Sequence, residues 1–106
     1  MIRVFLADDH PIVRDGLRQL LSREPDMTVV GEAADGRQAL LAAASVAIDV
    51  LILDLSLPRV SGIEVLRRMQ KDHPQIRVVV LSMYPEDQYA LRLLREGAAA
   101  YLSKDH

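Results

Sequence analysis

The chain has no cysteine among its 106 residues. This absence excludes a disulfide-stabilised scaffold, a zinc–thiolate site and a thiol nucleophile. Positive charge is also in short supply, because 13 Lys and Arg residues face 15 Asp and Glu residues and leave a net charge of −2. Binding to nucleic acid depends on dense Lys and Arg, so this balance argues against DNA binding by the segment itself.

Long hydrophobic runs are missing as well. No apolar run approaches the roughly 20 residues of a membrane helix, and the start Met1–Val4 goes straight into a strand-like pattern without the basic start plus apolar stretch of a secretory signal. We therefore expect a cytoplasmic protein without a membrane segment. Half of the residues are hydrophobic, which is enough at this length for one domain with its own core, over residues 1–106.

Five short apolar runs have the composition of buried strands. The first, third and fourth are nearly unbroken apolar runs rich in Val, Ile and Leu without polar alternation, which is typical of parallel strands buried on both faces. The predicted strands are Ile2–Ala7, Met27–Gly31, Val50–Leu53, Ile76–Leu81 and Ala98–Leu102.

Helical patterns fill the segments between the strands. The first predicted helix has Pro11 in its first turn and is stopped by Pro25. Asp35 and Ser61 are predicted N-caps of the second and third helices, and Gly97 is predicted to end a fourth.

This alternation predicts an α/β fold of three layers, with five parallel strands and helices on both faces of the sheet. The chain stops at His106, just after the fifth predicted strand. A sheet edge and one face would then stay uncovered, so we expect a fragment whose last helix is missing.

The distinctive polar residues lie at the carboxyl ends of the strands, where sites gather in open parallel sheets. Asp8 and Asp9 follow the first strand, and Asp54 ends the third. Ser82 ends the fourth strand and Lys104 follows the fifth. The predicted fold would bring these five residues to one rim of the sheet.

Carboxylates gathered at such a rim repel one another. At about 5 Å and an effective dielectric constant of about 20, each pair costs roughly 3 kcal/mol. Protonation or a bound cation must relieve this repulsion. An acidic rim without cysteine or clustered histidine matches the oxygen ligands that Mg²⁺ prefers, and not those of zinc, so we expect Mg²⁺ or Mn²⁺.

A carboxylate in such a site can act as a nucleophile and form an acyl phosphate. The metal, the Lys104 amine and the Ser82 hydroxyl would each meet one oxygen of the incoming phosphoryl group. Asp54 is the favoured nucleophile because it ends the central strand, although spacing alone does not rank it firmly above Asp9. His10 stands beside Pro11 and is interpreted as part of the helix entry, not as a catalytic base.

The same positions carry a resemblance to a known family. The sequence resembles the receiver domains of two-component systems through Leu6-Ala7-Asp8-Asp9-His10, Asp54-Leu55-Ser56-Leu57-Pro58 with Gly62, Leu81-Ser82 and Tyr101-Leu102-Ser103-Lys104. The stretch from Ala7 to Leu17 looks especially like the NarL/FixJ subfamily of response regulators, whose members carry a C-terminal helix-turn-helix of the LuxR type.

The resemblance implies a flavodoxin-like, CheY-like doubly wound sheet with strand order 2-1-3-4-5. It implies that Asp54 is the phosphoacceptor. It also implies that Asp8, Asp9, Asp54 and the backbone carbonyl of Ser56 hold Mg²⁺.

The resemblance further assigns Ser82 as the switch hydroxyl, Lys104 as the phosphate-pairing cation and Tyr101 as the aromatic switch residue. The implied partners are a sensor histidine kinase and, on phosphorylation, a second copy of the chain. DNA binding is implied only for a missing output domain of the parent protein.

Other functions remain as alternatives. An aspartate-nucleophile phosphohydrolase usually has a second Asp two residues after its nucleophile, and Ser56 stands there. A flavin or nucleotide binder needs a Gly- or Ser/Thr-rich loop after the first strand, whereas residues 8–11 are acidic. A degenerate receiver would act by protein contact only. We expect a signalling module and not a turnover enzyme.

Overall fold

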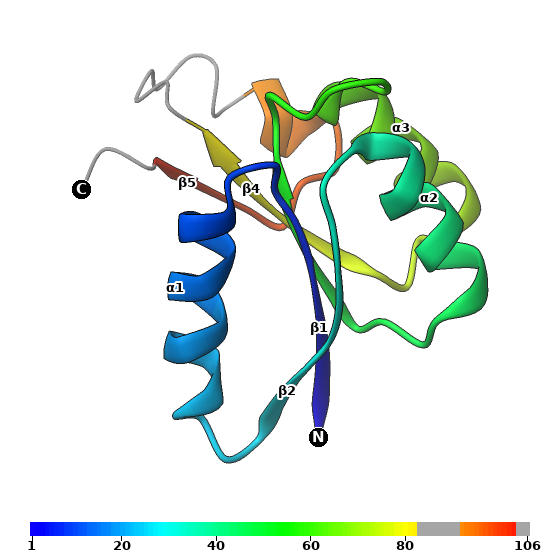
Figure 1. Cartoon of the computed structure of the whole chain (residues 1–106). Helices are drawn as coiled ribbons and strands as arrows, with labels where there is room; N and C mark the ends of the chain where they lie inside the picture. The colour runs from blue at the N-terminus through cyan, green and yellow to red at the C-terminus, as the bar shows by residue number, and fades with distance from the viewer. Residues whose placement is uncertain (83–91, 104–106) are drawn as a thin grey trace.

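The computed structural model describes residues 1–82 and 92–103. Five parallel strands form one sheet in the order β2-β1-β3-β4-β5, which confirms the predicted flavodoxin-like topology (Figure 1). The strands are β1 Ile2–Ala7, β2 Met27–Ala33, β3 Val50–Asp54, β4 Arg77–Ser82 and β5 Ala100–Ser103.

Within the described residues three helices flank this sheet, and a helical turn over residues 92–95 precedes β5. The helices are α1 Pro11–Ser22, α2 Gly36–Ser45 and α3 Gly62–Asp72. Helix α1 lies on one side of the sheet, and α2 and α3 lie together on the other (Figure 1). In the described part of the chain, no helix is long and apolar enough to span a bilayer.

The main core lies between the sheet and the layer of α2 and α3. Leu51 and Leu53 of β3 and Val65, Leu66 and Met69 of α3 are fully buried there. The three nearly unbroken apolar runs predicted from the sequence are β1, β3 and β4, which are the central strands of the sheet. The core holds the carboxyl ends of β1 and β3 side by side, with Ala7 opposite Leu53 in register.

Local capping rules explain where the helices begin. The Asp35 carboxylate accepts a hydrogen bond from the Gln38 backbone N–H at 2.8 Å, as predicted for an N-cap. The Ser61 hydroxyl accepts one from the Glu64 N–H at 3.3 Å. Helix α1 begins at Pro11, and the side chain of its N-cap residue His10 makes no capping hydrogen bond within the described residues.

An ion pair at the amino-terminal end of the sheet makes stability depend on pH. The Asp49 carboxylate accepts hydrogen bonds from the Arg3 backbone N–H at 2.8 Å and from its guanidinium at 3.0 Å. These hydrogen bonds lower the pKa of Asp49 to about 2.

We expect the stability difference between wild type and Asp49→Asn to be constant above about pH 5. Because the folded-state pKa lies below the unfolded value of about 4, the difference should shrink as the pH falls through about 2. Urea unfolding between these pH values measures it. Arg3→Gln should remove the same pH dependence, and a difference independent of pH would contradict the assignment.

Candidate functional site

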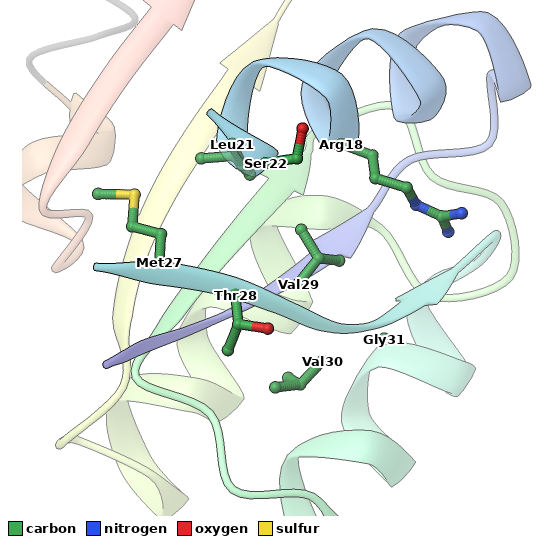
Figure 2. A pocket seen from close by; sticks show the side chains of 8 residues that line it. All are labelled: Arg18, Leu21, Ser22, Met27, Thr28, Val29, Val30 and Gly31. Atoms are coloured by element: carbon green, nitrogen blue, oxygen red, sulfur yellow. The ribbon is translucent and has the colours of Figure 1, made fainter. Parts of the chain in front are cut away.

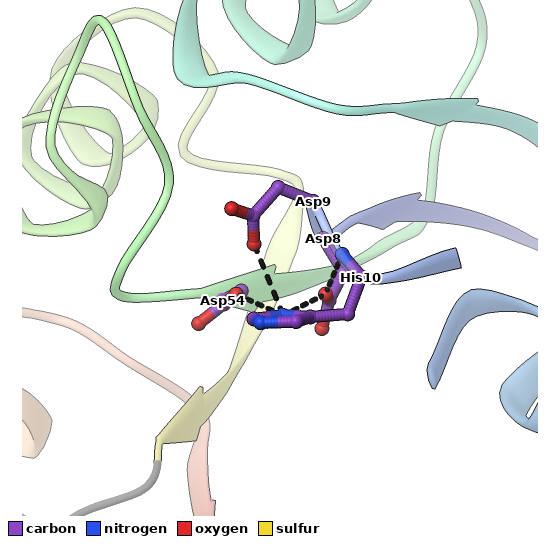
Figure 3. Close-up of side chains that lie close together, drawn as sticks. All are labelled: Asp8, Asp9, His10 and Asp54. Carbon is purple, nitrogen blue, oxygen red and sulfur yellow. Dashed lines mark hydrogen bonds and ion pairs between the residues drawn. The ribbon is translucent and has the colours of Figure 1, made fainter. Parts of the chain in front are cut away.

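Three predicted acids meet at the carboxyl edge of the sheet. Ligand atoms of Asp8, Asp9, His10 and Asp54 all lie within 4.8 Å of one another (Figure 3). We call these four residues the acidic cluster. Asp8 and Asp54 are each only 1% exposed, whereas the side chain of Asp9 is 33% exposed. The predicted convergence of the three acids is therefore correct.

The sheet fixes the two buried acids next to each other. Asp8 follows β1 and Asp54 ends β3, and the register of these neighbouring parallel strands brings the two positions to the same edge. The Asp8 backbone N–H donates to the carbonyl of Ala33 at 3.0 Å, so β2 also holds the start of the loop.

His10 is the member of the cluster that sequence reasoning missed. Its backbone serves as the helix entry, as predicted. Its ring nitrogen Nδ1, however, lies 3.1 Å from Asp8 Oδ1, 3.1 Å from Asp9 Oδ1 and 3.7 Å from Asp54 Oδ2 (Figure 3). The available signal was its position directly after two acids at a strand end.

Ser56 holds the carboxylate of Asp54. Its backbone N–H and its hydroxyl both donate to Asp54 Oδ1, at 3.0 and 2.9 Å. The other oxygen, Oδ2, is the one that lies toward His10. Ser56 thus lies beside the acidic cluster. The role of its carbonyl as a metal ligand stays a prediction.

The remaining predicted site residues lie on the last two strands. Ser82 ends β4 at 2% exposure, one residue after Leu81, which pairs with Asp54 in the sheet. Tyr101 lies in β5 opposite Val80. The predicted phosphate-pairing residue Lys104 lies outside the described residues.

Two glycines hold the loop that follows Asp54 through backbone hydrogen bonds. The Gly62 N–H donates to the Leu55 carbonyl, and the Gly36 N–H donates to the Pro58 carbonyl, each at 3.2 Å. A Cβ atom added at Gly62 would lie 2.5 Å from Leu55 Cα. Both helix starts therefore need glycine for this close approach, and together they position the loop that carries Ser56.

The carboxylate oxygens of the acidic cluster fit a hard divalent cation. Carboxylate and carbonyl oxygens are what Mg²⁺ prefers in proteins. Burying Asp8 and Asp54 beside a third carboxylate calls for counter-charge, because like charges at this distance repel strongly. A dication in the cluster would supply that charge.

A pocket with a volume of about 410 Å³ lies between α1 and β2 (Figure 2). Its lining comes from the second half of α1 and from β2, so it is separate from the acidic cluster. The lining residues are Arg18, Leu21, Ser22, Met27, Thr28, Val29, Val30 and Gly31.

Fold and site together define a flavodoxin-like α/β protein with an acidic, oxygen-rich cluster at the carboxyl edge of its parallel sheet. The chain belongs to the response regulator receiver domain family, whose model matches residues 4–106. It is a receiver domain of two-component response regulators, and the predicted resemblance is confirmed.

Similarity to individual response regulators agrees with this family assignment. The nitrate/nitrite response regulator NarL of Escherichia coli K12 is 40% identical over 102 residues, which cover 96% of this chain and 47% of that protein. A LuxR-family response regulator from Aurantimonas sp. SI85-9A1 has a TM-score of 0.89 at 37% identity, covering 97% of this chain and 74% of that one.

The isolated receiver of RcsB from Salmonella enterica serovar Typhimurium, solved with the phosphomimetic BeF3⁻, has a TM-score of 0.92 at 29% identity. That comparison covers 99% of this chain and 78% of that one. The chain spans about half the length of the curated relatives it matches.

Proposed function

We propose that this chain is a phosphorylation switch, in which a sensor histidine kinase transfers a phosphoryl group to Asp54 in a Mg²⁺-dependent reaction. The observation that carries the proposal is the convergence of Asp8, Asp9 and Asp54 at one edge of the sheet. The family and the phosphomimetic present with the RcsB receiver support it. Each chain accepts one phosphoryl group and is not a turnover enzyme.

Asp8, Asp9, Asp54 and the Ser56 carbonyl would hold Mg²⁺ or Mn²⁺, which neutralises charge on the carboxylates and on the transferred group. Ser56 orients Asp54 through its two hydrogen bonds to Oδ1. A bond forms between a carboxylate oxygen of Asp54 and phosphorus while the bond from phosphorus to the donor breaks, and the leaving group takes up a proton.

The switch would follow from the added charge. Phosphorylation takes Asp54 from −1 to about −2 and adds acceptor oxygens at the end of β3. The Ser82 hydroxyl, buried at the end of the neighbouring strand, would donate to one oxygen, and Lys104 would pair with another. Tyr101 would then follow Ser82, which shifts the population between two states of the β4–β5 surface.

The parent protein is proposed to be a transcription regulator of the cytoplasm. The matched relatives include proteins named as transcriptional or response regulators that are about twice as long as this chain. DNA binding would belong to an output domain outside residues 1–106, and phosphorylation would favour a homodimer.

Incubation with acetyl phosphate and Mg²⁺ followed by intact mass measurement tests the proposal. We expect about +80 Da on wild type, and no addition on Asp54→Ala or in the presence of EDTA. Asp15→Ala, which removes an exposed acid of α1, is the matched control and should be labelled like wild type. An unlabelled wild type would indicate a degenerate receiver that acts by protein contact only.

A further inference from the structure

We propose that the imidazole of His10 is a nitrogen ligand of the metal ion in the acidic cluster, which makes this site favour later first-row transition ions such as Ni²⁺ and Zn²⁺ over Mg²⁺. The inference rests on the metal site of the proposed function and adds a ligand to it. It concerns which ion the cluster selects, and the phosphoacceptor role of Asp54 does not depend on it.

The distances from His10 Nδ1 to Asp8 and Asp9 fit neighbouring positions in one coordination shell. Around an octahedral ion with bonds of about 2.1 Å, neighbouring ligand atoms lie roughly 3.0 Å apart. His10 Nδ1 lies 3.1 Å from one oxygen of Asp8, 3.1 Å from one of Asp9 and 3.7 Å from Asp54 Oδ2. In Figure 3 the dashed lines from all three carboxylates converge on this ring.

The backbone holds His10 at the cluster. Its N–H donates to Asp8 Oδ1 at 2.8 Å, and Pro11 follows as the first residue of α1. The backbone of His10, from which the ring extends, is therefore held beside Asp8. Its side chain is 57% exposed, whereas Asp8 and Asp54 are buried, so the imidazole stands on the solvent side of the acids.

The chemistry of the ring sets the expected preference. Sites made of oxygen ligands and water suit Mg²⁺, whereas an imidazole suits Ni²⁺, Zn²⁺ and other first-row ions. Replacing one oxygen ligand by His10 Nδ1 should raise affinity along the series from Mn²⁺ to Ni²⁺ and add little for Mg²⁺. The alternative role of His10 is an ion pair with the three acids. In that case a bound metal ion would displace the imidazole from the carboxylates.

Pulsed electron paramagnetic resonance of bound Mn²⁺ separates these two roles. We expect nitrogen modulation from a directly bound imidazole in the wild-type chain, and its loss in His10→Ala and His10→Gln. His73→Gln replaces the C-cap residue of α3 and is the matched control, which should keep the modulation. Circular dichroism checks that each variant is folded.

Titration with Ni²⁺ and Mg²⁺ gives an independent measurement. Replacing outer-shell partners of a metal already weakens binding about tenfold or more, so His10→Gln should weaken Ni²⁺ binding at least as much. Mg²⁺ binding should change far less. Mn²⁺ bound to wild type without nitrogen modulation, or an unchanged ratio of Ni²⁺ to Mg²⁺ affinity in His10→Gln, would overturn the inference.

Labelling by acetyl phosphate tells the two proposals apart. If wild type and His10→Gln are both phosphorylated with Mg²⁺ while Mn²⁺ shows no nitrogen signal, only the role of His10 fails. If wild type is never phosphorylated, the proposed function itself fails.

Discussion

Replacing Gly62 by alanine is expected to lower the free energy of unfolding by about 1–3 kcal/mol, the usual cost of forcing extra atoms into a packed region. The new Cβ would lie 2.5 Å from Leu55 Cα and 3.0 Å from the Asp54 carbonyl oxygen, and neither is a flexible side-chain end. Relief requires movement of the loop that carries Ser56. Urea unfolding measures the loss of stability, and Mg²⁺ titration should show weaker binding.

Gly16→Ala is the matched control for this substitution. Gly16 lies within α1, and among the described residues no atom outside its own helix and chain neighbours comes within 4 Å of an added Cβ. Alanine there should stabilise the chain by up to about 1 kcal/mol, because it restricts the unfolded state and favours helix. A Gly62→Ala protein as stable as wild type, with normal Mg²⁺ binding, would refute the close-packed loop.

The second large effect is the stabilisation of the chain by metal. An ion at about 100 times its dissociation constant stabilises a folded protein by about 2.7 kcal/mol. For a domain of this size, this corresponds to a rise in Tm on the order of 10 °C or more. Thermal unfolding of wild type with and without Mg²⁺ should show this rise, and Asp9→Asn should lose most of it.

Without metal, Asp9→Asn should be slightly more stable than wild type. The substitution removes one of three carboxylates that face a single imidazole. Because Asp9 is partly exposed, solvent screening limits the gain to about 1 kcal/mol. Asp15→Asn, on the exposed side of α1, should keep the full response to Mg²⁺. An equal rise in Tm for Asp9→Asn and wild type would mean that the ion binds elsewhere.

The fold was predictable where local rules decide it. Strand β1 occupies Ile2–Ala7 as predicted, because a short run that is apolar except for Arg3 is typical of a buried strand. The N-caps Asp35 and Ser61 were predictable because capping depends on neighbouring residues alone.

Strand β2 shows where local pattern is insufficient. It was predicted to end at Gly31, but it continues through Ala33, since Glu32 and Ala33 pair with Leu6 and Ala7 of β1. Pairing with a neighbouring strand, and not the hydrophobicity of β2 itself, sets its length. Charged Glu32 is tolerated there because Arg14 and Arg18 of α1 pair with it.

For the site, the sheet topology was enough to predict that the three acids lie together. Strand ends of a parallel sheet meet at one edge, so Asp8, Asp9 and Asp54 could be brought together without coordinates. The ring of His10 could not be placed, because a side chain at a helix N-cap can turn toward solvent or toward the cluster. Contacts with Asp8 and Asp9 of its own loop and with Asp54 at the end of β3 decide that choice.

The most direct measurement locates the transferred group on the chain. After treatment with acetyl phosphate and Mg²⁺, borohydride reduces an acyl phosphate of aspartate to homoserine, and peptide mapping then identifies the converted residue. We expect homoserine at position 54 and at no other acid of the cluster. Homoserine at position 8 or 9, or none at all in wild type, would contradict it.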